Sequence, residues 1–248
     1  MKDRSWQLTL AGGLLALSAA LYFVHYLLFR DAHHIFLYLV GDVAFLPVEV
    51  LLVTLVIHRL LTAREKRQLL EKMNMVIGAF FSEVGTELLR LGAASDANFA
   101  AVRGNLVVSG RWTRRDFAEV GRRLAGFDYQ VDASPADLAA LRAFLSARRD
   151  FLLRLLENPN LLEHESFTAL LWAVFHLAEE LARRGDLAAL PPADRAHLSG
   201  DLKRAYVLCI AAWLQYMEHL KAAYPYLFSL ALRTNPFDPA AEVEVKAA

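Results

Sequence analysis

Two acidic residues lie within a long apolar stretch near the N-terminus, where a carboxylate is unusual. Asp42 and Glu49 are seven residues apart and therefore share one helical face. In a bilayer such a group costs roughly 2.5–3.5 kcal/mol, so it usually faces protein or water. We expect His25 to lie at the depth of Asp42, and Ser18 to be the polar group nearest Glu49. The pair predicts either hydrogen bonds within a helix bundle or a path for ions or protons.

A second group of ionisable residues could bind a metal. Glu163, His164 and Glu165 are followed by His176, Glu179 and Glu180. Glu165 and His176 are eleven residues apart, roughly 16 Å along a helix, so they cannot share an ion. His176 and Glu179 are three apart and can, with Glu218 and His219 from a later helix completing the site. A solvated helix face is the alternative interpretation.

The sequence contains none of the common catalytic or cofactor-binding motifs. We find no glycine-rich phosphate loop, no HExxH, no GxSxG and no CxxC. The 27 basic residues are balanced by 27 acidic ones, which gives no electrostatic footprint for nucleic acid. The single cysteine, Cys209, lies in an apolar run and is expected to be a small buried side chain. The sequence therefore predicts no cofactor and no enzymatic activity.

The N-terminal quarter predicts two transmembrane helices, over about residues 6–29 and 41–61. The first stretch carries no charge over a length sufficient to cross a bilayer. The second is interrupted by Gly41 and Pro47, so it could also be a longer, kinked helix that begins before residue 41. Basic residues flank the two ends of this hairpin. The positive-inside rule therefore predicts that both termini of the chain lie in the cytoplasm. A cleaved signal peptide is the alternative for the first stretch.

Small residues mark two faces on which helices could pack closely. Gly12, Ala16 and Ala20 recur every four residues in the first span, where they could contact the second span or another chain. Gly78 and Gly85 lie seven apart beside a short heptad-like seam of apolar residues: Leu70, Met73, Ile77, Phe80 and Val84. This seam could pack into the chain's own bundle or mediate self-association.

The rest of the chain predicts an all-α cytoplasmic domain. The sequence predicts a connecting helix over residues 62–92 that ends at Gly92. It predicts a helical bundle over residues 93–233 and a flexible tail over residues 234–248. Residues 93–111 read as a loop or irregular element. Helices are expected over about 114–125, 135–157, 161–184 and 193–223, with a last piece to 233. The apolar runs 167–178 and 206–214 should be central core helices.

Basic residues gather in one segment of this domain. Between positions 103 and 123 there are six arginines against two acids, with an aromatic residue among them. A stretch of this kind near a membrane anchor could contact anionic headgroups, and a solvated or protein-paired face is the alternative. The residues concerned are Arg103, Arg111, Trp112, Arg114, Arg115, Arg122 and Arg123.

Three segments resemble an uncharacterised prokaryotic family of proteins with two transmembrane helices. They are WLQYMEHLKAAYPYLFSLALRTNPF at 213–237, GDVAF at 41–45 and FFSEVG at 80–85. The resemblance covers most of the chain and implies no activity and no catalytic residue.

Together these features predict a membrane-anchored, non-enzymatic helical protein that acts through protein contacts. We expect a homo-oligomeric scaffold or sensor in a prokaryotic inner membrane, in contact with lipid and an unknown protein partner. A pore or transporter subunit that uses Asp42 and Glu49 is the first alternative. A membrane-bound metalloenzyme that uses His176 and Glu179 is the second.

Overall fold

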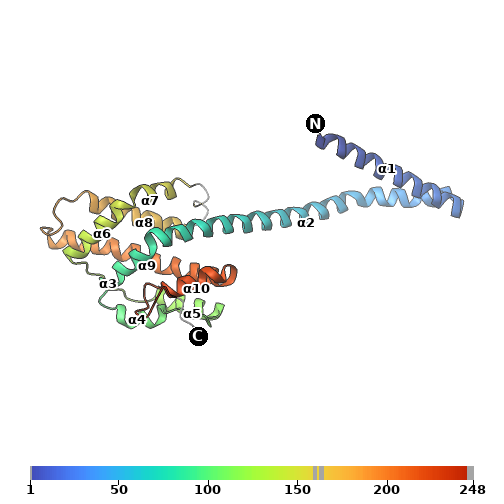
Figure 1. The fold of residues 1–248 in the computed structure, drawn as a ribbon. Helices are drawn as coiled ribbons and strands as arrows, with labels where there is room; N and C mark the ends of the chain where they lie inside the picture. The colour runs from blue at the N-terminus through green and yellow to red at the C-terminus, as the bar shows by residue number, and fades with distance from the viewer. Residues whose placement is uncertain (1, 159–160, 162–164, 245–248) are drawn as a thin grey trace. The chain divides into compact units, whose positions relative to one another are not determined.

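The computed structural model describes residues 2–158, 161 and 165–244, and every regular element in them is helical (Figure 1). The predicted all-α class is therefore confirmed. Contacts divide the chain into two units, residues 1–66 and 67–248. The first unit contains α1 (Lys2–Phe29) and the beginning of α2 (Ala32–Phe80).

The two N-terminal helices are joined by a tight connection. Arg30 adopts a positive φ of 51°, and the Asp31 carboxylate accepts a hydrogen bond from the backbone N–H of His34 at 3.2 Å. This Asp31 contact satisfies one of the free N–H groups at the start of α2. The segment before residue 41 is thus helical, not a loop, and α2 continues through Pro47.

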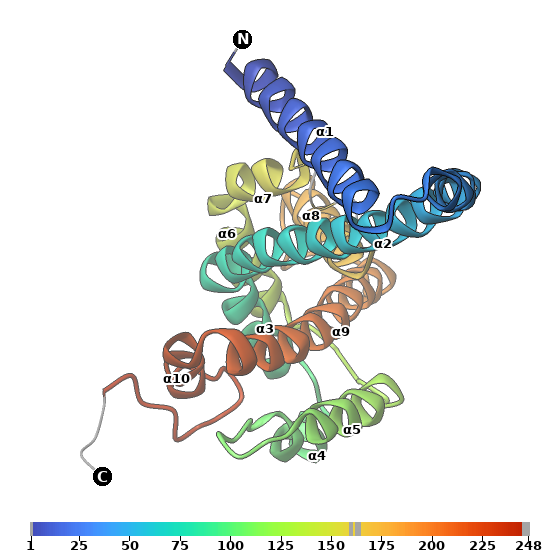
Figure 2. The same cartoon turned by 90° about the vertical axis from the view of Figure 1, so that its right-hand side faces the viewer.

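Both helices carry segments long and apolar enough to cross a membrane, over Thr9–Phe29 and Ala32–Thr62. None of the residues in their most apolar windows is buried within the structure. Helix α1 splays away from α2 towards its N-terminus (Figures 1 and 2). Large apolar side chains consequently remain exposed on every side of the two helices, with Leu15 at 73% and Val40 at 68%.

The second unit is a helical domain built around one long helix. Helix α9 (Pro192–Ala223) runs through its middle (Figure 2). Helices α6 (Pro135–Ala147), α7 (Arg149–Leu156) and α8 (Glu165–Ala182) lie on one side, and α5 (Arg114–Ala125) lies on the other. The predicted core helices are confirmed, because Leu170 and Val174 of α8 and Tyr206 and Cys209 of α9 are all fully buried.

The end of α2 packs into this domain. Met73, Ile77, Phe80 and Val84 are all buried in its hydrophobic core, so the apolar seam serves the chain's own bundle. A π-helical turn, η1 (Phe81–Gly85), follows α2 and leads directly into α3 (Thr86–Ala94).

Two predicted helix starts are confirmed by capping boxes. At the start of α5, the Thr113 hydroxyl accepts from the Asp116 backbone N–H, and the Asp116 carboxylate accepts from the Thr113 backbone N–H. Ser134 and Asp137 form the same reciprocal pair at the start of α6. Each pair satisfies two backbone donors that would otherwise have no partner.

Several sequence-based boundaries are wrong. Gly92 does not end a helix; it lies inside α3, where a Cβ atom would come within 2.4 Å of the Tyr206 ring. The segment predicted to be irregular contains α4 (Phe99–Leu106), and the helix predicted over 135–157 breaks at Arg148.

The C-terminal segment differs from the flexible tail that we expected. After α10 (Pro225–Arg233), Asn235 is buried and donates to the Leu106 carbonyl at 3.0 Å. Phe237 is 2% exposed, and its ring meets that of Trp213 edge-on at a centroid distance of 5.1 Å. The first residues after α10 therefore belong to the folded domain.

Candidate functional site

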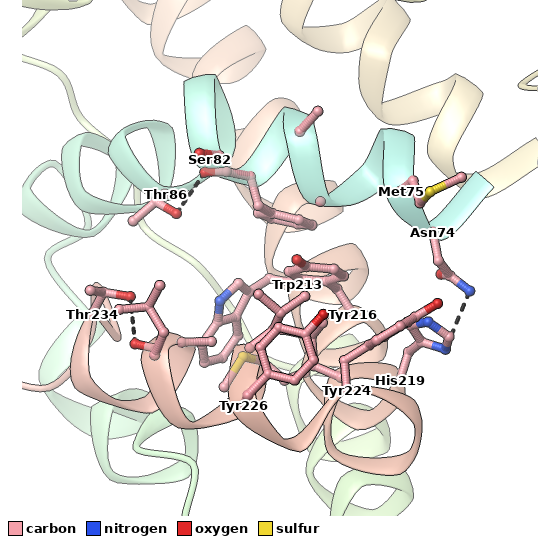
Figure 3. Close-up of a pocket in the computed structure, with 18 of the residues that line it drawn as sticks. Asn74, Met75, Ser82, Thr86, Trp213, Tyr216, His219, Tyr224, Tyr226 and Thr234 are labelled. Atoms are coloured by element: carbon pink, nitrogen blue, oxygen red, sulfur yellow. Dashed lines mark hydrogen bonds between the residues drawn. The ribbon is translucent and has the colours of Figure 1, made fainter. Parts of the chain in front are cut away.

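An aromatic groove lies between α2, α9 and α10, and exposed apolar side chains stand at its rim (Figure 3). Its volume is about 540 Å³, within the range of ligand-binding clefts. Its lining is mainly apolar and aromatic, with a few polar groups. The lining includes the following polar, aromatic and methionine side chains: Asn74, Met75, Phe81, Tyr216, His219, Tyr224 and Tyr226.

Two interruptions of helical geometry shape the groove. Tyr224 leaves the helical conformation (φ −137°, ψ 71°) because Pro225 follows it, and α10 then packs back on α9. On the facing wall, the π-helical turn places Phe81 over Tyr216, with ring centroids 5.2 Å apart and nearly parallel planes. Single π-helical turns are frequent at functional sites.

The backbone of Gly78 lies directly against the Tyr216 ring in the wall of the groove. A Cβ atom on Gly78 would lie 2.9 Å from the Tyr216 hydroxyl oxygen, so the glycine lets the ring approach the helix. Gly85 plays a similar part within the π-helical turn, where a Cβ would lie 2.4 Å from the Phe81 ring. Burial raises the pKa of Tyr216, which keeps it a neutral phenol.

Asn74 and His219 form a polar end of the groove, and apolar side chains stand at its rim. The Asn74 side-chain amide lies 3.3 Å from Nδ1 of His219 (Figure 3). At the rim, Met75 is 65% exposed and Tyr226 is 71% exposed. Exposed apolar side chains beside an aromatic cavity are typical of a surface that contacts another molecule.

The sequence did not reveal this groove. Tyr224 and Tyr226 lie in the segment 213–237, whose only sequence signal is its resemblance to the uncharacterised family. The sequence suggests a metal site, not a groove, for His219. The signal that could have found the groove is the aromatic spacing around Pro225: Trp213, Tyr216, Tyr224 and Tyr226. The π-helical turn that forms the opposite wall has no sequence signature of its own.

The structure rearranges the predicted metal-binding residues. His176 lies beside Asp201 and His197. The Glu179 carboxylate instead forms an ion pair with the Arg149 guanidinium, with an N···O distance of 3.0 Å. The pKa of Glu179 is accordingly lowered by its hydrogen bonds with Arg149 and Arg183. The structure thus groups His176 with Asp201 and His197, and it places Glu179 with two arginines.

The other members of that predicted cluster are dispersed. Glu218 lies 3.3 Å from Arg114, and His219 faces the aromatic groove. Glu165 begins α8 and is exposed, while Glu163 and His164 lie outside the described residues.

The N-terminal unit brings some of the predicted polar residues together. His25 and Asp42 line one cavity of about 260 Å³ at the connected ends of α1 and α2, together with His34. The rings of His25 and His34 stack with centroids 5.8 Å apart. Ser18 lines a neighbouring hollow with His25, and Glu49 is exposed on α2.

The small-residue face of α1 is not covered by α2 in this structure. A Cβ atom on Gly12 would meet no described atom within 4 Å, and Ala16 and Ala20 are exposed. The expectation that the second span packs on this face is not met within the chain.

The arginine segment divides into two groups. Arg103 donates to the Phe237 carbonyl, Arg114 lies beside Glu218, and Arg123 pairs with Glu119. Trp112 is half-buried and packs edge-on against Phe117. The remaining arginines of the segment are exposed: Arg111, Arg115 and Arg122.

Comparison with known proteins gives a family and no activity. Residues 2–61 match a family described as the MJ1433 N-terminal helical domain, and residues 69–233 match the C-terminal helical domain of the uncharacterized protein MJ1433. The protein of that name from Methanocaldococcus jannaschii is 47% identical over 238 residues, which cover 96% of each chain. No solved structure matches the chain.

Proposed function

The chain belongs to the MJ1433 family, and from that premise we propose that it is a membrane-anchored helical protein that acts through contacts with other proteins. In this proposal, α1 and the first part of α2 cross a prokaryotic membrane as a hairpin. The domain after them lies in the cytoplasm and engages partners through its aromatic groove.

The observation that supports membrane anchoring is the lack of burial in the most apolar parts of the N-terminal helices. A core helix of a soluble protein buries its apolar face, but no residue of the most apolar windows in α1 and α2 is buried here. Exposing a side chain such as Leu, Ile or Phe to water costs about 1.5–3 kcal/mol each. A lipid bilayer removes this cost for the whole hairpin at once.

The groove supports the contact role. It combines an apolar interior with rim residues Met75 and Tyr226, and aromatic and methionine side chains are enriched where proteins meet. Its polar contact between Asn74 and His219 joins a carboxamide to an imidazole and so contains no hydroxyl or thiol nucleophile. Binding, rather than covalent chemistry, is what this arrangement supports.

A photo-crosslinker at position 226 tests the groove. With benzoylphenylalanine replacing Tyr226 in the full chain in native membranes, irradiation should give a discrete adduct with another chain. The same amino acid at Ala140, an exposed position of α6, is the matched control and should give none. Equal adducts at both positions, or none at 226, would contradict the role of the groove.

We further propose that the protein forms homo-oligomers through the small-residue face of α1. Gly12, Ala16 and Ala20 are spaced for close helix approach and remain uncovered by the chain's own α2. Replacing Gly12 and Ala16 by Leu should reduce the oligomer to a monomer in mild detergent, as measured by light scattering.

The control places added volume on the opposite helix face. Leu14 is about 160° from the Gly12 position, so Leu14→Phe should leave the oligomer intact. A monomeric wild type, or the same loss in both variants, would refute assembly through this face.

A second candidate function is ion or proton conduction, favoured by the cavity that holds His25, His34 and Asp42. In liposomes, the full chain should then conduct, and Asp42→Asn or Glu49→Gln should abolish the flux while leaving the protein folded. The absence of flux from wild-type liposomes would remove this candidate.

A further inference from the structure

A cluster of two histidines and one carboxylate lies on the face that joins α8 and α9, away from the aromatic groove residues. Nε2 of His176 is 3.4 Å from Oδ2 of Asp201, and Nε2 of His197 is 3.3 Å from the same oxygen. One donor atom of each residue lies within 4.8 Å of those of the other two. Three potential ligand atoms therefore converge from two packed helices.

Helical spacing explains the convergence. His197 and Asp201 are four residues apart on α9, and so are His176 and Glu180 on α8. Each pair occupies one face of its helix, and the packing of α8 on α9 sets the two faces opposite one another. Glu180 completes the arrangement, with its Oε2 atom 3.7 Å from Nε2 of His197.

Asp201 is the buried anchor of the cluster. It is 3% exposed, and its Oδ1 atom is engaged by Arg204 at 3.2 Å. Among the described residues, its Oδ2 atom has no hydrogen-bond partner, although it is buried. Burying a carboxylate oxygen without a partner costs free energy. A ligand bound between this oxygen and the two imidazoles would offset that cost.

The distances fit a shared metal better than direct hydrogen bonds. Charge-assisted N–H···O bonds are typically about 2.7–2.9 Å, shorter than the two separations seen here. A tetrahedral zinc site with bonds of about 2.0–2.1 Å has ligand atoms roughly 3.3–3.4 Å apart. The two separations in the structure, 3.4 and 3.3 Å, match that edge length.

We propose that His176, His197 and Asp201 bind a divalent transition-metal ion of the zinc class. Two imidazoles and one carboxylate form a ligand set common in metal sites that keep one position open. That fourth position is left to water or to Glu180, whose carboxylate is hydrogen-bonded by Arg184 at 2.7 Å.

The surroundings allow the ion to enter from solvent. The side chains of His176 and His197 are 47% and 53% exposed, so the open side of the site faces water. The buried carboxylate of Asp201 closes the other side. This site is independent of the proposed function, because none of its ligands lines the aromatic groove.

Cobalt titration of the full chain in detergent tests the site. After treatment with a chelator, the protein should bind one equivalent of Co²⁺ with the visible absorption of a tetrahedral nitrogen and oxygen site, and Zn²⁺ should displace it. Replacing even an indirect ligand partner weakens metal binding by 10- to 100-fold, so His176→Ala, His197→Ala and Asp201→Asn should each weaken it at least about 100-fold.

Two control variants keep the test specific. Glu179→Gln changes the neighbouring carboxylate that is paired with Arg149, and His58→Ala removes a histidine of the N-terminal helices; both should bind Co²⁺ as tightly as the wild type. The exposed histidines can be replaced without opening the core. Absence of tetrahedral absorption in the wild type, or equal binding by the three ligand variants and the controls, would overturn the proposal.

Discussion

The contact between Gly92 and Tyr206 gives the sharpest prediction about how the second unit is packed. A Cβ atom on Gly92 would lie 2.4, 2.7 and 3.1 Å from three atoms of the Tyr206 side chain. Tyr206 is fully buried, and the Tyr129 ring meets it edge-on at 5.7 Å, so it has no room to retreat. Gly92→Ala should therefore force α3 and α9 apart.

The magnitude follows from two opposing effects. Overpacking a core costs about 1–3 kcal/mol, and this contact belongs at the upper end because ring atoms cannot yield. Alanine in a helix interior regains up to about 1 kcal/mol relative to glycine. The net loss should be about 2 kcal/mol, which lowers the Tm of a domain of this size by about 4–8 °C.

Gly200→Ala on α9 is the matched control, because a Cβ atom there would meet nothing within 4 Å. It should be more stable than the wild type, by up to about 1 kcal/mol. Thermal unfolding of the full chain in detergent, followed by circular dichroism, measures both. If Gly92→Ala is as stable as Gly200→Ala, the packing of α3 on α9 described above is wrong.

Two further variants test groups in the same domain. Tyr206→Phe removes a hydroxyl that is buried without a hydrogen-bond partner among the described residues, so it should raise stability by about 1 kcal/mol; a lower Tm would show that the hydroxyl is satisfied. The hydrogen bond from Arg184 lowers the pKa of Asp194, so this ion pair stabilises the fold above the unfolded-state pKa of about 3.9 and the stabilisation is lost as pH falls through the lower folded-state pKa. Asp194→Asn should thus be less stable than the wild type at pH 7, with the difference shrinking as the pH falls below the unfolded-state pKa, and a difference that stays constant down to the acid unfolding transition would contradict this assignment.

Local signals allowed the elements to be predicted well where the chain carries its own start and stop residues. Thr113 with Asp116, and Ser134 with Asp137, are capping boxes that can be recognised in sequence because both partners lie within one turn. The apolar runs of α8 and α9 could also be predicted to form core helices, because helices that are apolar on most sides have to be buried.

Tertiary contacts explain the errors. Gly92 has the chemistry of a helix terminator, but it serves instead to admit the Tyr206 ring, a residue 114 positions later in the chain. Phe237 follows the last helix in a segment without periodicity, yet Trp213 holds it in the core. Neither role is visible before the fold is known.

The neighbours of His176 show the same dependence on tertiary contacts. Sequence spacing suggests Glu179, three residues away on the same helix, as the carboxylate next to His176, whereas the structure places Asp201 beside it across a helix interface. The spacing of His197 and Asp201 was available, but only the packing of α8 on α9 shows that it faces His176.

The most direct test of the membrane-anchored arrangement is labelling with a membrane-impermeant maleimide on intact cells. Cys209 is the only cysteine, it is fully buried, and burial raises the pKa of its thiol, so the natural chain provides an unreactive background. Cysteine introduced at Ala32, the first residue of the second apolar segment, should be labelled from outside. Cysteine at Ala188, exposed in the second unit, should be labelled only after the membrane is permeabilised. Equal labelling of both positions on intact cells, or protection of position 32 together with labelling of position 188, would contradict a hairpin anchor with a cytoplasmic domain.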